Sequence, residues 1–197
     1  MNNLKNRYFL LRHGRNIHQT ELANIHYCWP DDTPPVSLLP EGIEQIEKDG
    51  EILKDKHIDC IYSSDILRTR QTAEIVAKII GYDLEKIIYD ERLRDSNWGI
   101  FGGKKIDESW KFFNDDRLKR FEVAPPEGES WKDCQKRVIE ALKDIEKNNQ
   151  NKNILIISHG DPLWLLEGYM EGMDTKTLIS REKDLEMEPG ELKEIYE

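Results

Sequence analysis

The sequence is poor in cysteine and lacks long apolar runs. Its three cysteines, Cys28, Cys60 and Cys134, are an odd number at wide spacings with no CxxC pair, which argues against a disulfide framework and a zinc knuckle. We expect them to be reduced packing residues. No apolar run approaches the roughly 20 residues of a membrane span, and residues 1–14 lack the apolar core and cleavage site of a signal peptide. These absences predict a cytoplasmic protein without membrane association.

Basic residues are outnumbered by acidic ones, 29 Lys and Arg against 39 Asp and Glu, giving a formal net charge of -10. This balance opposes binding to nucleic acids and anionic membranes, because such partners attract mainly Lys and Arg. An anionic small molecule would need a local positive pocket. The 38% hydrophobic and 35% charged residues are typical of a globular protein, and we expect a single domain over residues 1–197 with one active site.

Four short segments rich in aliphatic residues predict buried strands of a parallel sheet, because their apolar character is nearly continuous. They are residues 8–11, 58–62, 87–89 and 154–157. Between them, apolar stripes at helical spacing predict one helix from near Asp65 to Gly81 and another that begins near Ser130. Strands alternating with helices predict the fold class, an α/β protein built as a three-layer α/β/α sandwich with a mostly parallel central sheet.

Two further segments show no strong periodicity. Residues 18–40 contain Pro30, Pro34, Pro35 and Pro40, which predicts a surface excursion rather than a linker between domains. The charge-rich segment 181–197 predicts a solvated edge of the domain, with a short last strand over residues 192–196.

Cationic and imidazole side chains directly follow three of the predicted strands. Arg12 and His13 follow the first, Ser63, Ser64 and then Arg68 follow the second, and His159 follows the fourth. Ligands of open α/β sheets bind beyond the carboxyl ends of the strands, so these groups are expected to converge on one pocket. Two guanidinium groups and two imidazoles suit a phosphoryl group, because arginine presents a fork of donors that matches phosphate oxygens.

The sequence Leu11-Arg12-His13-Gly14 resembles the signature of the histidine phosphatase (phosphoglycerate mutase-like) superfamily. Four further segments resemble the family's motifs in the same order: residues 63–73 (SSDILRTRQTA), 93–102 (LRDSNWGIFG), 126–130 (PEGES) and 158–160 (SHG). A three-letter Arg-His-Gly is a weak signal alone, whereas five motifs in order are a strong one. The resemblance extends from Tyr8 to about Gly168.

The resemblance implies a role for each matching residue. His13 would be the nucleophile that forms a phosphohistidine; Arg12, Arg68 and His159 would bind phosphoryl oxygens; and Asp95 would be the proton donor. A neutral imidazole is a competent nucleophile near pH 7, and guanidinium groups can neutralise the charge of the transferring group. The resemblance therefore implies neither a cofactor nor a metal ion. A metal site on His13 and His159 is also disfavoured because neither histidine is part of an HxH, HExxH or DxH spacing.

The sequence departs from the family pattern around the pocket. The family most often has Glu where Asp95 stands, which leaves Glu91 as an alternative acid. Gln19 occupies the position of a family Asn, and we include Gln19 and Asn16 as candidate phosphate-binding residues. Arg15 adds a cation at the rim. Glu127 replaces a Gly, and Asp161 stands where a small residue is common; together they predict a more acidic mouth.

Several residues have a simpler structural interpretation. Asp161 before Pro162 predicts a helix N-cap with proline at the first helical position. We expect His18, His26 and His57 to face solvent or form local hydrogen bonds. For Trp29, Trp98, Trp110 and Trp164 the sequence leaves two alternatives open, core or pocket wall.

The favoured function is hydrolysis of a small phosphorylated substrate, a phosphomonoester, by a metal-independent phosphatase. Two alternatives stand beside it: a cofactor-dependent phosphoglycerate mutase, which passes the phosphoryl group back to a hydroxyl, and a weakly active phospho-ligand-binding protein. The chain lacks the Glu-Arg-His-Tyr-Gly form of the mutase acid loop, which favours the phosphatase. The sequence leaves the natural substrate and the oligomeric state open.

Overall fold

The computed structural model describes residues 4–195, and its centre is a five-stranded sheet. The strands are β1 (Arg7–Arg12), β2 (Cys60–Ser63), β3 (Ile88–Tyr89), β4 (Asn153–Ser158) and β5 (Leu192–Ile195), in the spatial order β3-β2-β4-β1-β5. All neighbours are parallel except β5, which runs antiparallel to β1. This arrangement confirms the predicted mostly parallel sheet.

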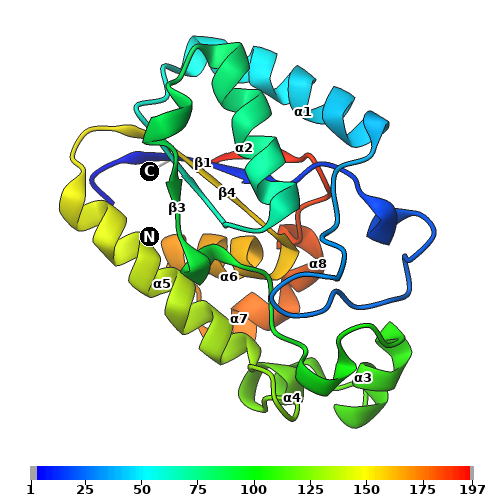
Figure 1. Cartoon of the computed structure of the whole chain (residues 1–197). Helices are drawn as coiled ribbons and strands as arrows, with labels where there is room; N and C mark the ends of the chain where they lie inside the picture. Colours follow the sequence, from blue (N-terminus) through cyan, green and yellow to red (C-terminus); the bar gives the residue numbers. More distant parts are fainter. Residues whose placement is uncertain (1–3, 196–197) are drawn as a thin grey trace.

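Helices cover both faces of the sheet, as Figure 1 shows. One layer contains α1 (Pro40–Leu53) and α2 (Leu67–Ile80), and the other contains α5 (Trp131–Asn148) and α6 (Gly160–Met170). Four shorter helices lie outside these layers: α3 (Ile106–Phe112), α4 (Arg117–Glu122), α7 (Thr175–Ser180) and α8 (Glu182–Leu185). The predicted three-layer sandwich is therefore confirmed.

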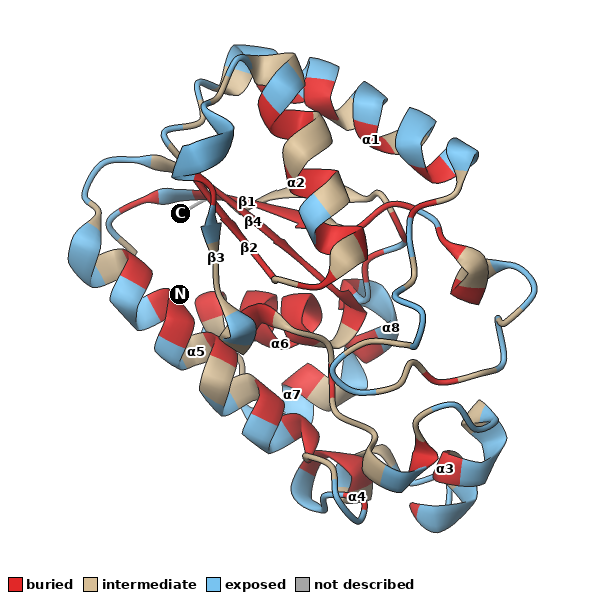
Figure 2. Ribbon diagram, in the orientation of Figure 1, coloured by how far each residue is buried: buried red, intermediate tan, exposed pale blue. Residues whose placement is uncertain are grey.

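The two central strands divide their side chains between two hydrophobic cores. In β1, Phe9 and Leu11 pack with the α1 and α2 layer, whereas Tyr8 and Leu10 pack with the α5 and α6 layer. The side chains of β4 alternate in the same way. Each fully buried aliphatic side chain contributes about 1.5–3 kcal/mol relative to exposure. Burial on both faces explains why these strands are almost continuously apolar in sequence (Figure 2).

The prediction of burial is wrong for β3. This strand is the edge of the sheet, it has two residues, and Ile88 is 46% exposed. The prediction for β2 begins two residues early, because His57 adopts a left-handed turn (φ 49°) and the strand starts only at Cys60. Periodicity alone does not separate a buried strand from a partly exposed edge.

The ends of the two predicted helices are confirmed. Gly81 ends α2 with a left-handed φ of 72°, a conformation that glycine adopts without steric cost. The hydroxyl of Ser130 accepts a hydrogen bond from the backbone N–H of Asp133 and caps α5. The predicted last strand corresponds to β5, while Tyr196 lies outside the described residues. Within the described part of the chain, no helix has the length and apolar character to span a bilayer.

Candidate active site

The carboxyl ends of β1, β2 and β4 meet at one edge of the sheet. Arg12 pairs in register with Ser158, and Ser63 pairs with Ile157 on the other side of β4. His13 and His159 follow directly, with their ring centroids 5.2 Å apart, and each is at most 1% exposed. Parallel register therefore brings together groups that are almost 150 residues apart in sequence, as predicted.

His13 is held as a neutral imidazole in a defined tautomer. Its Nδ1 lies 2.9 Å from the carbonyl oxygen of Gly14, and because a carbonyl only accepts, Nδ1 carries the proton. The lone pair is therefore on Nε2. Burial lowers the pKa of His13 well below its usual value, and the positive charges of Arg68 and Arg12 lower it further. The ring has the protonation state that a nucleophile requires.

Several buried nitrogens at this site have no hydrogen-bond partner among residues 4–195. They are Arg12 Nε, Arg68 Nε and Nη2, and His159 Nδ1. Other nitrogens of these side chains are already hydrogen-bonded. Arg68 Nη1 donates to Asp31 Oδ1 at 3.1 Å, and His159 Nε2 lies 3.0 Å from Ser64 Oγ. Leaving buried donors unpaired is costly, so these nitrogens form a cradle suited to an anion.

Asp95 lies against this cradle. Its Oδ2 is 3.5 Å from Arg68 Nη2 and 3.8 Å from His159 Nδ1. Burial raises the pKa of Asp95, the charges of Arg68 and Arg12 oppose the rise, and the nearby carboxylate of Asp161 reinforces it. The alternative acid, Glu91, has a side chain that is 74% exposed and pairs with Arg94 at 3.4 Å. The structure thus brings Asp95, and not Glu91, to Arg68 and His159.

Arg137 fixes the loop that carries Asp95. From α5 it donates to the carbonyl oxygens of Arg92, Arg94 and Asp95, each at 2.7 Å, and it pairs with the carboxylate of Glu129 at 2.6 Å. Sequence reasoning did not identify Arg137. In the sequence, Arg137 is a single cation beside the apolar stripe of α5. A surface salt bridge would account for an arginine at that position equally well.

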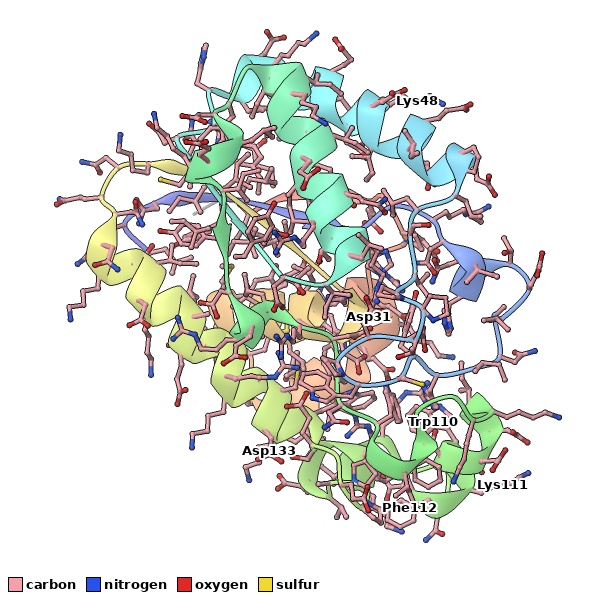
Figure 3. All side chains as sticks on the ribbon, in the orientation of Figure 1. Asp31, Lys48, Trp110, Lys111, Phe112 and Asp133 are labelled. Atoms are coloured by element: carbon pink, nitrogen blue, oxygen red, sulfur yellow. The ribbon has the colours of Figure 1, made fainter. Side chains whose placement is uncertain are left out.

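The proline-rich excursion lies largely at the surface, as predicted, and two of its residues also reach the site. Tyr27 stacks on Arg68, with the guanidinium carbon 3.9 Å from the ring centroid. The carboxylate of Asp31 accepts a hydrogen bond from Nη1 of the same arginine. Figure 3 shows Asp31 beside the N-terminal end of α2. Residues 18–40 therefore position Arg68, a role that the sequence analysis missed.

The two amide candidates occupy different environments. Gln19 lines the cavity described below, but its amide is already bonded: Oε1 accepts from the backbone N–H of Asn16 at 3.0 Å, and Nε2 donates to Tyr27 Oη at 3.1 Å. Asn16 is fully buried, and its Nδ2 has no partner in the described chain. Gln19 Nε2 thus has one of its two N–H groups engaged, whereas Asn16 Nδ2 has both N–H groups without a partner in the described chain.

A cavity of about 590 Å³ opens beside the cradle. Its lining comes from five separate parts of the chain. The lining residues include Arg12, Arg15, His26, Asp95, Trp98, Trp110, Arg117, Trp131, Asp161, Glu182, Glu186 and Glu188. Figure 3 shows Trp110 on the side of α3 that faces the body of the protein. Trp98 and Trp110 are thus pocket wall, whereas Trp164 is core and Trp29 is exposed.

The predictions about the surroundings of the cavity are confirmed in part and wrong in part. The segment after Arg181 is the predicted solvated edge only in part, because Glu182 is buried while Lys183, Asp184, Glu186 and Glu188 are exposed. Glu182, Glu186, Glu188 and Pro189 line the cavity. His26 is 7% exposed and bonds to Ser109, 83 residues away, so it neither faces solvent nor bonds locally. His18 is also buried, although its bonds to Ile25 and Asp32 are local as predicted, and His57 is exposed.

Asp161 is not a helix cap. Helix α6 begins at Gly160 with His159 as its N-cap, which places Asp161 inside the first turn. Its carboxylate instead accepts hydrogen bonds from the indole N–H groups of Trp131 (2.7 Å) and Trp164 (3.4 Å). The sequence also predicts that Asp161 and Glu127 make the mouth of the pocket more acidic. Asp161 does line the cavity, whereas Glu127 is not among its lining residues.

Glu127 has a left-handed backbone, with φ at 62°, at the position where the family pattern has Gly. We expect Glu127→Gly to raise the free energy of unfolding by roughly 0.5–1 kcal/mol. Relief of a penalty of about 1–2 kcal/mol outweighs the greater freedom of glycine in the unfolded chain, about 0.4–1 kcal/mol. Thermal unfolding should show Tm rising by a few degrees. Glu127→Ala keeps the Cβ atom and should not show this gain; an equal rise in both variants would contradict the explanation.

Among the described residues, no three His, Cys, Asp or Glu side chains are grouped so that they could hold a metal ion.

The sequence profile of the histidine phosphatase superfamily (branch 1) matches residues 8–186. A probable phosphoglycerate mutase, GpmB of Erwinia tasmaniensis, is 32% identical over 171 residues, covering 84% of this chain and 74% of the relative. The phosphoglycerate mutase of Schizosaccharomyces pombe is 26% identical, covering 88% and 83%.

Solved structures share the fold. Bacillus stearothermophilus YhfR aligns with a TM-score of 0.72 at 28% identity, covering 88% of this chain and 83% of that one. The alpha-ribazole phosphatase of Shigella flexneri aligns with a TM-score of 0.77 at 21% identity, covering 96% and 90%. Since the family profile extends over nearly the whole chain, the protein belongs to the histidine phosphatase superfamily, branch 1.

Proposed function

We propose that the protein hydrolyses small phosphomonoesters through a phosphohistidine on Nε2 of His13. The observation that carries this proposal is the position of a neutral imidazole with its lone pair on Nε2 next to buried, unpartnered donors of Arg12, Arg68 and His159. Members of the superfamily are phosphatases or mutases, and both reactions begin with transfer to a histidine. The cradle provides what that first step requires.

In the proposed reaction, Nε2 of His13 attacks phosphorus and the bond to the leaving oxygen breaks. The guanidinium groups of Arg12 and Arg68 and the imidazole of His159 bind the phosphoryl oxygens, where charge develops. Asp95, protonated, donates its proton to the leaving oxygen. The carboxylate then removes a proton from a water molecule, which attacks phosphorus and releases His13 and inorganic phosphate. Because guanidinium groups offset the charge, we expect turnover to persist in EDTA.

The mutase alternative rests on the match to GpmB. Incubation with 3-phosphoglycerate separates the possibilities: a phosphatase releases inorganic phosphate over many cycles, whereas a mutase forms 2-phosphoglycerate with little phosphate release. We expect many turnovers of phosphate release from p-nitrophenyl phosphate. Mutase activity without hydrolysis, or a single phosphate bound and never released, would contradict the proposed function.

The pH dependence of kcat/KM should have its maximum on the acidic side of neutrality. Asp95 acts as the acid, so activity falls as pH rises through its pKa, which burial raises. His13 must be neutral, and its lowered pKa keeps it so in mildly acidic solution. The profile is best measured with an alkyl phosphate, because a poor leaving group depends on the acid. A flat profile from mildly acidic to mildly alkaline pH would contradict this assignment.

A further inference from the structure

The cavity beside the cradle carries more acidic than basic groups. Beyond Arg12 and Asp95, which belong to the cradle, its lining contains four carboxylates, Asp161, Glu182, Glu186 and Glu188, and two guanidinium groups, Arg15 and Arg117. Arg117 is ion-paired with Glu182, and Glu186 lies 3.9 Å from Arg12 of the cradle, which leaves Asp161 and Glu188 without an ion pair to a cation of the lining. Arg15 is exposed at the rim, and a further cation, Arg120, is buried behind the wall formed by Trp98 and Trp131. The lining of the cavity is therefore acidic on balance.

A buried histidine points to the same kind of ligand independently. The hydroxyl of Ser109 donates to the carbonyl oxygen of Ile106 at 2.8 Å, so toward His26 it can only accept. His26 Nε2, 2.7 Å from that hydroxyl, therefore carries the proton, and Nδ1 has the lone pair. His26 is only 7% exposed and lines the cavity. Its Nδ1 receives no hydrogen bond from residues 4–195. It is an unused acceptor.

The carboxylates and His26 Nδ1 are hydrogen-bond acceptors, so they favour a ligand that carries hydrogen-bond donors. The carboxylate of Asp161 is held in place by two indole N–H groups, and it lines the same cavity as Asp95. Glu186 and Glu188 extend the acidic wall to the mouth. A ligand with N–H donors and a positive charge satisfies both the carboxylates and His26, whereas a carboxylate on the ligand meets like charges.

We propose that the preferred substrates are phosphomonoesters of amino alcohols, in which a protonated amine on the leaving group lies against Asp161, His26 and the acidic wall. This inference rests on the proposed function and specifies its substrate class. It also separates the protein from phosphoglycerate-using relatives, because phosphoglycerate has a carboxylate where this cavity favours an amine.

Three phosphate esters of equal length test the inference: 3-aminopropyl phosphate, 3-hydroxypropyl phosphate and 3-(phosphonooxy)propanoate. We expect kcat/KM for the amine to exceed that for the alcohol by about tenfold or more, and the carboxylate to be the poorest substrate. The preference for the amine should weaken as salt is raised, because the carboxylates at the mouth are solvent-exposed. An alcohol or a carboxylate that is used as well as the amine would overturn the inference.

A charge-matched pair of variants identifies the wall as the cause. The double variant Glu186→Gln/Glu188→Gln should reduce the ratio of amine to alcohol by about threefold or more. Glu44→Gln/Glu47→Gln removes the same charge from the exposed surface of α1 and should leave the ratio unchanged. Equal effects of the two pairs would overturn the inference. Turnover of p-nitrophenyl phosphate without an amine preference refutes the substrate class alone, whereas no turnover of any ester refutes the proposed function.

Discussion

Replacing His13 by alanine is expected to lower kcat for p-nitrophenyl phosphate by roughly 10⁴-fold or more, because removal of a covalent nucleophile leaves only binding and charge stabilisation. KM should change far less, since the guanidinium groups that hold the phosphoryl group remain. Steady-state kinetics measure the effect, and the exposed His57 provides the control: His57→Ala should keep full activity. A His13→Ala variant within tenfold of the parent would rule out His13 as the nucleophile.

The geometry of His13 also predicts which ring nitrogen becomes phosphorylated. Nδ1 of His13 is engaged with the carbonyl of Gly14, so the phosphoryl group must attach to Nε2. Rapid quenching in base, which preserves the acid-labile bond, followed by phosphorus NMR distinguishes the two ring positions. Phosphorylation at Nδ1, or on any residue other than His13, would contradict the tautomer inferred from the geometry.

Asp95→Asn is expected to separate substrates by their leaving groups. The amide keeps the shape of the side chain but has no proton to give, so alkyl phosphates should slow by roughly 10² or more. For p-nitrophenyl phosphate the first step should be spared, because its anion departs with little help. Water then lacks its base, so the phosphoenzyme should accumulate and produce a burst of p-nitrophenol.

Glu91→Gln is the matched control, because it makes the same chemical change on the exposed side of the same loop. It should leave both substrate types unaffected. If Glu91→Gln showed the leaving-group dependence and Asp95→Asn did not, the acid would be Glu91 and the loop would have to rearrange during catalysis.

The sheet and the cradle were predictable because they follow from local signals. The central strands are recognisable by their apolar runs, and parallel strands place their carboxyl ends together, so Arg12, His13 and His159 had to meet. The family motifs assigned roles to the same positions. Neither signal depends on how distant loops fold.

The walls of the cavity were not predictable, because they form through contacts that have no local signature. Nothing in the proline-rich segment indicates that Tyr27 stacks on Arg68 and that Asp31 pairs with it. The sequence Asp-Pro favours a cap, but two indole N–H groups from α5 and α6 hold Asp161 differently. A run of acidic residues after Arg181 is typical of a solvated surface, and only tertiary packing turns it toward the cavity.

The pairing of β1 has a consequence for synthesis on the ribosome. The proposed nucleophile is translated well before Gly190, whose backbone N–H donates a hydrogen bond to the carbonyl oxygen of His13, and the backbone N–H of Arg12 donates to Glu191. β1 itself lies between β4 and β5, which are translated more than 140 residues later. At about 5–20 residues per second, a nascent chain spends several seconds with β1 unpaired. We therefore expect the surroundings of His13 to assemble only once translation has passed β5, so that unfinished chains would lack the proposed activity and would leave that apolar strand unpaired.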